Sequence, residues 1–268
     1  METDQGRFNG TEGEVFYRSW RADDPRHVVL LAHGYAEHIG RYEHVAATLV
    51  EGGAAVFGLD HLGHGQSAGD RVVIETFDHV VDDLHEIGSM ARSSHPELPV
   101  VLVGHSMGGL IATLYAEEHG EELNGLVLSA PVLGEWATVG ELLRYEEIPE
   151  TPIDPDTLSR DPEVGRDYAE DPLNYRGAFK RPTLEALRAG MAKATEHADR
   201  ITLPVLYLHG EEDELVPLQP SREAVEGFAS DDVERHFYPG ARHEVFNETN
   251  SDEVLGHVRD FIERVTSR

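Results

Sequence analysis

The sequence contains no cysteine and only two lysines, Lys180 and Lys193. Without cysteine the chain forms neither disulfides nor thiolate metal sites, and cysteine usage therefore gives no indication of the redox compartment. The chain also lacks an apolar run of the ~20 residues that a transmembrane helix needs. Residues 1–13 are polar and acidic, without the basic start or apolar core of a signal peptide, so we expect a cytoplasmic protein.

Positive charge is scarce as well, because 51 acidic residues face 22 basic ones and the net charge is −29. Such a charge repels the phosphates of nucleic acids and anionic membrane surfaces, which disfavours both as partners. It indicates either adaptation to a salty habitat or a source with biased codon usage.

The 268 residues, 40% of them hydrophobic, are enough for one large domain with a sizeable core. Strand-like and helix-like segments alternate, which is typical of a mainly parallel sheet covered by helices. Residues 15–20 predict an antiparallel edge strand. The other expected strands are residues 28–32, 54–59, 100–103, 126–128, 205–208 and 233–238, and the clearest helices are 41–51, 77–87 and 110–119.

Residues 131–182 interrupt this alternation, since they contain many prolines, acids and arginines but no apolar strand. We interpret them as a cap inserted over the carboxyl ends of the strands, where ligands bind in such sheets. The core is then formed by residues 1–130 and 183–268. The alternative is a long surface excursion without function.

A candidate nucleophile lies between an expected strand and an expected helix. Residues 104–108 read Gly-His-Ser-Met-Gly, the nucleophile-elbow pattern with Ser106 at its centre. The serine of such an elbow occupies a strained turn, so its neighbours must lack side chains that would strike the adjacent strand or helix. The glycines on both sides of Ser106 meet this demand.

Serine needs a base to take its proton, and the base needs an acid that holds its tautomer. In folds with this elbow the chain order is serine, acid, histidine. Asp213 follows the strand 205–208 in the pattern His-Gly-x-x-Asp-x-x-Val, although three glutamates surround it. His243 lies in the loop after the last strand, whereas His236 and His257 lie inside expected elements. The sequence therefore predicts Ser106, Asp213 and His243 as a catalytic triad.

Acyl transfer also needs two N–H donors for the developing oxyanion. We expect the backbone N–H of Met107, directly after the nucleophile, and that of Tyr35, in the loop after the strand 28–32. A metal site at His61 and His64 is the alternative chemistry, but no helical His-Glu-x-x-His motif accompanies these residues. We therefore predict no metal and no cofactor.

At this point the sequence resembles the monoacylglycerol lipases and the lysophospholipase-like enzymes grouped with them, within the α/β-hydrolase fold. The resemblance extends from about Phe16 to the end of the chain. It is carried by residues 33–42 (His-Gly-Tyr-Ala-Glu-His-Ile-Gly-Arg-Tyr), 60–67 (Asp-His-Leu-Gly-His-Gly-Gln-Ser), 104–109, 159–161 with 171–173, and 239–244 (Pro-Gly-Ala-Arg-His-Glu).

The resemblance implies an apolar channel for an acyl chain under the cap and a small polar pocket for glycerol. By this analogy, the polar pocket is formed by Glu37, Arg41, His105 and the cap residue Tyr168. Glu37 and Arg41 have a second interpretation, a purely structural ion pair that steadies the oxyanion loop. A cap that docks on lipid should expose an apolar patch, whereas residues 146–150 and 154–156 of this cap are very acidic.

We therefore expect a serine hydrolase that cleaves monoacylglycerols through an acyl-enzyme. The alternatives are a lysophospholipase, a short-chain or aryl carboxylesterase, an enzyme acting on peptide amides, and a hydrolase-fold protein that only binds a ligand. A small acyl ester is the expected partner, with at most transient membrane contact through the cap. The sequence carries no indication of the oligomeric state.

Overall fold

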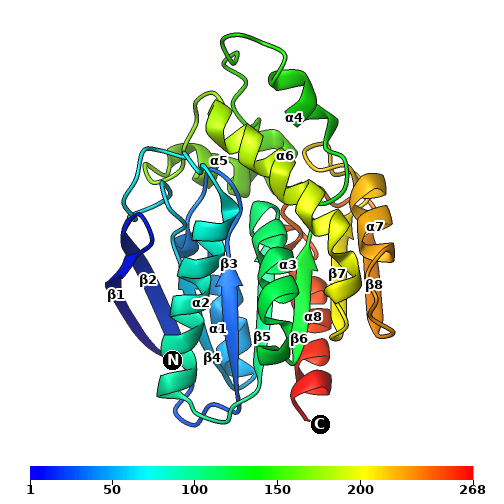
Figure 1. The fold of residues 1–268 in the computed structure, drawn as a ribbon. Coiled ribbons are helices and arrows are strands. Elements are labelled where there is room, and N and C mark those ends of the chain that lie inside the picture. Colours follow the sequence, from blue (N-terminus) through cyan, green and yellow to red (C-terminus); the bar gives the residue numbers. More distant parts are fainter. Residues whose placement is uncertain (268) are drawn as a thin grey trace.

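A single eight-stranded sheet forms the centre of the molecule in the computed structural model, which describes residues 1–267 (Figure 1). The strand order is β1-β2-β4-β3-β5-β6-β7-β8, with β1 and β2 antiparallel and the other six strands parallel. The strands are β1 (Glu2–Gly10), β2 (Gly13–Arg21), β3 (His27–Ala32), β4 (Ala54–Leu59), β5 (Val100–His105), β6 (Gly125–Ser129), β7 (Val205–Gly210) and β8 (Val233–Tyr238).

Helices cover both faces of this sheet, as Figure 1 shows. Side chains of α2 and α3 share one hydrophobic core with the sheet, and those of α1 and α8 share the other. The helices are α1 (Glu43–Glu51), α2 (Phe77–Ser94), α3 (Met107–His119), α4 (Ala137–Leu142), α5 (Pro162–Glu170), α6 (Arg181–Glu196), α7 (Leu218–Glu226) and α8 (Ser251–Thr266). Short 3₁₀ turns occupy Ile39–Tyr42, Gly120–Glu122, Pro155–Thr157, Ala198–Arg200 and Val245–Asn247.

The strands β3 to β7 have every residue buried, because helices lie on both of their faces. Burial on two faces produces continuous apolar runs rather than alternation, and this is the signal that the sequence carries. The expected α/β-hydrolase sheet is confirmed, including all six predicted parallel strands.

The sequence prediction was wrong about the edge of the sheet. Strand β2 is antiparallel as expected, but it lies inside the sheet, because β1 pairs with it along nine residues, from Glu2 opposite Arg21 to Gly10 opposite Gly13. Strand β1 is polar and largely exposed, so it lacks both the apolar run and the alternation that reveal other strands.

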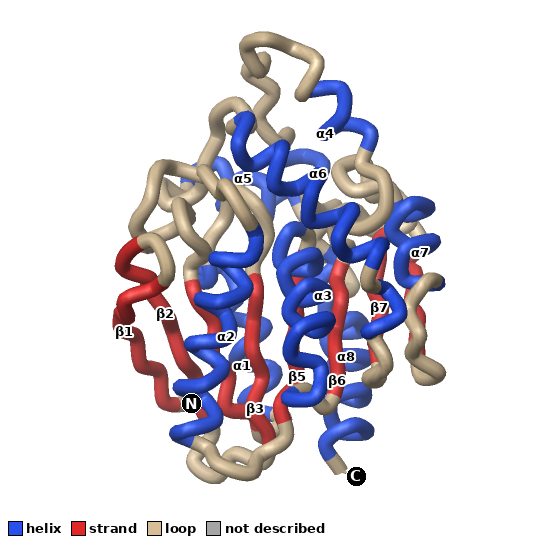
Figure 2. Tube along the Cα trace, in the orientation of Figure 1, coloured by secondary structure: helices blue, strands red, loops and turns tan. Residues whose placement is uncertain are grey.

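Residues 131–182 contain no strand, and the helices α4 and α5 lie with the start of α6 at the carboxyl end of the sheet (Figures 1 and 2). Helix α6 begins at Arg181, so it crosses the expected boundary at residue 182. Arginines fasten this segment to the core: Arg160 pairs with Glu248 at 2.8 Å, and Arg242 donates to the carbonyl oxygen of Ser159 at 2.9 Å. Among the described residues no helix is both long enough and apolar enough to cross a membrane.

Candidate active site

Ser106 lies in the sharp turn that joins β5 to α3. Its φ of 55° falls in the left-handed region that non-glycine residues rarely adopt. A Cβ at Gly104 would collide with the carbonyl oxygen of Gly108, and one at Gly108 would collide with that of Ala32 in the neighbouring strand. The glycines therefore let the turn pass close to α3 and β3 while the serine is held in a strained conformation.

Three strand ends bring the predicted triad together. His243 Nε2 lies 2.9 Å from Ser106 Oγ, and His243 Nδ1 lies 2.8 Å from Asp213 Oδ2. Ser106 follows β5, Asp213 follows β7 and His243 follows β8, and the serine and histidine are both buried. This geometry allows the imidazole to take the serine proton while the carboxylate fixes its orientation.

The carboxylate of Asp213 is also held by its own loop. Its Oδ1 accepts hydrogen bonds from the backbone N–H groups of Leu215 and Val216, both at 2.9 Å. His209 Nε2 lies 3.1 Å from its Oδ2. Burial acts to raise the pKa of Asp213, but His243, His209 and their hydrogen bonds lower it well below its usual value. Asp213 is therefore ionised, whereas the neighbouring Glu211, Glu212 and Glu214 are exposed.

The electrostatics of His243 follow from the acids around it. Burial alone would lower the pKa of this imidazole, but the Asp213 carboxylate raises it, with smaller contributions from Glu244 and Glu37. The net effect is a pKa above 6.5. The site thus favours the imidazolium that forms when the histidine accepts a proton.

The loop after β3 places Tyr35 next to the serine. Glu37 Oε1 accepts hydrogen bonds from the N–H of Gly34 at 2.6 Å and from the hydroxyl of Tyr42 at 2.7 Å. Tyr35 and Met107 both line the cavity at Ser106. The N–H of Met107 begins α3, so it has no partner within the helix and is available to an oxyanion.

Arg41 lies between two buried glutamates. Its guanidinium contacts Glu37 at 2.6 Å and forms two hydrogen bonds with Glu244, at 2.7 and 2.8 Å. Arg41 is not among the described residues that line the cavity, whereas Glu37 and Glu244 are. The guanidinium therefore links the loop that carries Glu37 to Glu244, and the two carboxylates, but not Arg41, border the cavity.

The two other residues expected in the polar pocket line the cavity too. His105 Nδ1 lies 3.0 Å from Ser129 Oγ, and burial lowers the pKa of His105 to about 3, so its imidazole is neutral. Tyr168 donates its hydroxyl to the carbonyl oxygen of Tyr175 at 3.2 Å, and its ring lies over Arg41. The hydroxyl proton of Tyr168 is thus already engaged, and the residue contributes its ring to the cavity lining.

His61 and His64 form a buried cluster with His33 beneath the oxyanion loop, with ring centroids 4.2 to 6.5 Å apart. His61 donates its backbone N–H to His33 Nε2 at 3.0 Å, and its own Nε2 lies 3.1 Å from the His33 carbonyl oxygen. Burial lowers the pKa of His61 to about 3 and that of His64 to about 4. These neutral imidazoles support the loop that carries Tyr35.

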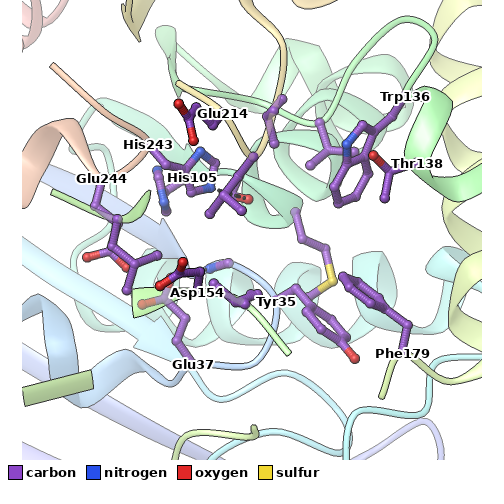
Figure 3. A pocket seen from close by; sticks show the side chains of 18 of the residues that line it. Tyr35, Glu37, His105, Trp136, Thr138, Asp154, Phe179, Glu214, His243 and Glu244 are labelled. Carbon is purple, nitrogen blue, oxygen red and sulfur yellow. Dashed lines mark hydrogen bonds between the residues drawn. The ribbon is translucent and has the colours of Figure 1, made fainter. Parts of the chain in front are cut away.

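A cavity of about 280 Å³ adjoins Ser106 and His243 (Figure 3). One part is apolar, and there the ring of Phe179 stacks on Tyr35 at 4.7 Å and meets Trp136 edge-on. The other part is acidic. The apolar lining includes Met107, Val132, Trp136, Phe179 and Leu187, and the acidic lining comprises Glu37, Asp154, Glu214 and Glu244.

Sequence reasoning missed several of these residues. Glu244 follows His243 in the resembling segment, but its pairing with Arg41 links positions 203 residues apart, which no local pattern reveals. His209 stands in the His-Gly pattern that located Asp213, and that adjacency was the available signal.

The geometry can be compared with known proteins. A family model described as "Serine aminopeptidase, S33" (Hydrolase_4) matches residues 23–250. A monoacylglycerol lipase of Mycolicibacterium smegmatis is 39% identical over 266 residues, which cover 95% of each chain. The monoglyceride lipase of Homo sapiens is 33% identical over 245 residues, 87% of this chain and 81% of that protein.

Solved structures give the same result. A thermostable carboxyl esterase from Bacillus coagulans, solved in complex with glycerol, has a TM-score of 0.87 at 26% identity and covers 99% of both chains. The predicted family and fold are thereby confirmed. The chain belongs to the serine aminopeptidase S33 family (Hydrolase_4) of the α/β-hydrolases, and it is a serine hydrolase of carboxylic esters.

Proposed function

We propose that this enzyme hydrolyses monoacylglycerols to a fatty acid and glycerol, with Ser106 as nucleophile, His243 as general base and acid, and Asp213 as the residue that orients His243. The observation that carries the proposal is the continuous Ser106–His243–Asp213 hydrogen-bond chain next to a cavity with an apolar and a polar part. The names of the relatives point to the same substrate class.

In the acylation step, Ser106 Oγ attacks the ester carbonyl carbon while His243 Nε2 takes the serine proton. The carbonyl oxygen gains the charge and is bound by the N–H groups of Tyr35 and Met107. Each such donor contributes on the order of 3 kcal/mol of transition-state stabilisation. The bond to the alcohol oxygen then breaks, and His243 passes its proton to the leaving glycerol.

In the deacylation step, a water molecule replaces the alcohol. His243 takes a proton from this water, and the hydroxide attacks the acyl carbon. The bond to Ser106 Oγ breaks, Ser106 recovers its proton from His243, and the fatty acid leaves. The Asp213 carboxylate, which raises the pKa of His243, stabilises the imidazolium in both steps.

We propose that residues 131–182 act as the cap over this site. Support comes from Trp136, which borders the apolar part of the cavity, and from Asp154 and Tyr168, which border its polar end. In this arrangement the acyl chain lies against Trp136 and Phe179, and the glycerol lies near Glu37 and His105. A cytoplasmic location and transient membrane contact through the cap remain predictions from the sequence.

The test is Ser106→Ala, assayed by fatty-acid release from a monoacylglycerol and by labelling with a fluorophosphonate probe. We expect loss of both signals and an unchanged circular dichroism spectrum. Retained turnover in this variant would contradict the assignment of Ser106 as the nucleophile. Absence of fluorophosphonate labelling in the unmodified protein would favour a protein that only binds its ligand.

A lysophospholipase is the second candidate, because its acyl chain would occupy the same apolar part of the cavity. The acidic lining disfavours it, since Asp154 and Glu214 would repel a phosphate placed beside them. Rates on esters with one acyl chain and either a glycerol or a glycerophosphocholine leaving group would separate the two activities. A series of acyl lengths, including acetyl and aryl esters, tests the carboxylesterase alternative.

A further inference from the structure

A second group of side chains that could act together lies far from the cavity, at the other end of α3. It consists of His85 on α2, His119 at the end of α3, and Glu122 in the 3₁₀ turn that follows. Helix α3 has 13 residues, from Met107 to His119, and an α-helix rises about 1.5 Å per residue. The group therefore lies roughly 20 Å from Ser106. Figure 1 shows α2 and α3 side by side on the same face of the sheet.

Each of the three side chains offers one ligand atom, and these atoms all lie within 4.8 Å of one another. The imidazoles of His85 and His119 are stacked, with centroids 4.0 Å apart and planes inclined by 22°. The side chains of His85 and Glu122 are 32% and 30% exposed, so an ion can reach them from solvent. No other group of this kind occurs within residues 1–267.

We propose that His85, His119 and Glu122 bind one divalent transition-metal ion of the zinc type. Two imidazole nitrogens and a carboxylate oxygen are the donor set that zinc accepts, whereas magnesium and calcium require oxygen donors. Ligand atoms of a tetrahedral zinc site lie about 3.4 Å apart, given bonds of about 2.1 Å. The three ligand atoms now lie within 4.8 Å of one another, and rotation of these partly exposed side chains can bring them to the shorter separation.

The donor atoms suit the proposal. An imidazole binds a metal through the lone pair of a ring nitrogen and a carboxylate through an oxygen, and these are the atoms that the three residues bring within 4.8 Å of one another. The large negative charge of the protein also raises the local concentration of cations. The bound ion would fasten α2 to the end of α3, which gives it a stabilising role separate from ester hydrolysis.

Arg92 opposes metal binding. Its guanidinium lies 2.9 Å from Glu122 Oε2 and 3.4 Å from the hydroxyl of Tyr115, which also donates to Glu122. Coordination requires Glu122 to exchange this cation for the metal. Removal of the guanidinium should therefore tighten metal binding, an effect opposite to that of removing a ligand.

The experiment is calorimetric titration of the chelator-treated protein with Zn²⁺, repeated with Mg²⁺. The unmodified protein should bind one equivalent of Zn²⁺ tightly, and Mg²⁺ should not compete for it. We expect His119→Gln and His85→Gln to weaken this binding at least tenfold and Arg92→Gln to strengthen it. Zinc should raise the melting temperature of the unmodified protein and leave that of His119→Gln unchanged.

The control variant is His236→Gln. His236 stacks on His257 at 3.8 Å and pairs with Glu234, but the ligand atoms of these three described residues do not all lie within 4.8 Å of one another. This variant should bind zinc like the unmodified protein. The proposal is overturned if the single equivalent is absent, or if it keeps its affinity in His119→Gln or is lost in His236→Gln. Arg92→Gln retains all three ligands, so it tests the site independently of any folding defect in the histidine variants.

Discussion

His209 Nε2 lies 3.1 Å from the same Asp213 oxygen that His243 Nδ1 contacts at 2.8 Å. Both side chains of the Asp213–His209 pair are fully buried. The carboxylate that orients His243 is thus itself oriented by a second histidine, which does not contact the serine. We infer that His209 is a positioning residue for the triad.

His209→Leu should therefore lower kcat about tenfold with little effect on KM, because a hydrogen bond to a charged group contributes about 1.5–3 kcal/mol and the substrate does not touch this residue. Steady-state kinetics and the rate of fluorophosphonate labelling check this. His257→Leu removes a histidine whose partner is the Tyr238 hydroxyl, away from the cavity, and serves as the control. Equal losses in the two variants would show that only stability was changed.

The pH dependence follows from His243. Its neutral form is the base, and its pKa is raised above 6.5, so activity should fall as the pH decreases through a midpoint above 6.5. Glu244→Gln removes a negative charge that raises this pKa and should move the midpoint to lower pH. The profile of kcat/KM against pH measures the shift. Glu234→Gln, outside the cavity lining, should leave the midpoint in place, and an unmoved midpoint in Glu244→Gln would contradict the electrostatic account.

Asp154 and Glu214 should select against anionic substrates (Figure 3). Removing both charges by Asp154→Asn with Glu214→Gln should raise kcat/KM for a phosphorylated monoacylglycerol by up to about thirtyfold at low salt. The basis is about 1 kcal/mol for each pair of like charges at about 4 Å in water. The rate on the neutral ester should stay the same.

A control pair for this experiment is Asp156→Asn with Glu212→Gln, which removes two exposed charges close in sequence but outside the cavity lining. Salt should reduce the discrimination of the unmodified enzyme, because it screens exposed charges. If the control pair improves the anionic substrate equally, the effect comes from net charge alone.

Alanine substitutions at two glycines, one in the elbow and one in α4, should have opposite effects on stability. Gly108→Ala places a Cβ against the carbonyl oxygen of Ala32, so it should lower the free energy of unfolding by about 1–3 kcal/mol or more and also reduce activity. A Cβ at Gly140, inside α4, meets nothing within 4 Å, so Gly140→Ala should stabilise the protein by up to about 1 kcal/mol. Thermal unfolding measures both, and a stable, active Gly108→Ala would contradict the steric account of the turn.

Most of the sheet could be predicted from the sequence because its central strands are buried on both faces. Strand β1 could not, since its side chains face solvent and carry no pattern. The segments that follow the strands were equally informative. The elbow, the His-Gly-x-x-Asp pattern and the last loop identified Ser106, Asp213 and His243, and in the structure His243 lies within hydrogen-bond distance of the other two residues.

The remainder of the site depends on contacts between distant positions. The Glu37–Arg41 pair could be suggested from the sequence, but nothing near Arg41 indicates that its guanidinium also pairs with Glu244 and lies outside the cavity lining. The same holds for Asp154 and Glu214, 60 positions apart along the chain yet both in the lining of the cavity. Acidic residues are so frequent in this protein that composition could not single them out.

Strands β6 and β7 are neighbours in the sheet, yet the chain between them contains α4, α5 and α6. The reacting groups follow β5, β7 and β8, whereas Trp136 and Phe179 belong to this one connection. A loop whose ends are already fixed by adjacent strands can be lengthened or exchanged at small entropic cost. On the proposed cap assignment, we therefore expect that transplanting residues 131–182 from a relative with another acyl preference changes selectivity and leaves Ser106, Asp213 and His243 in place.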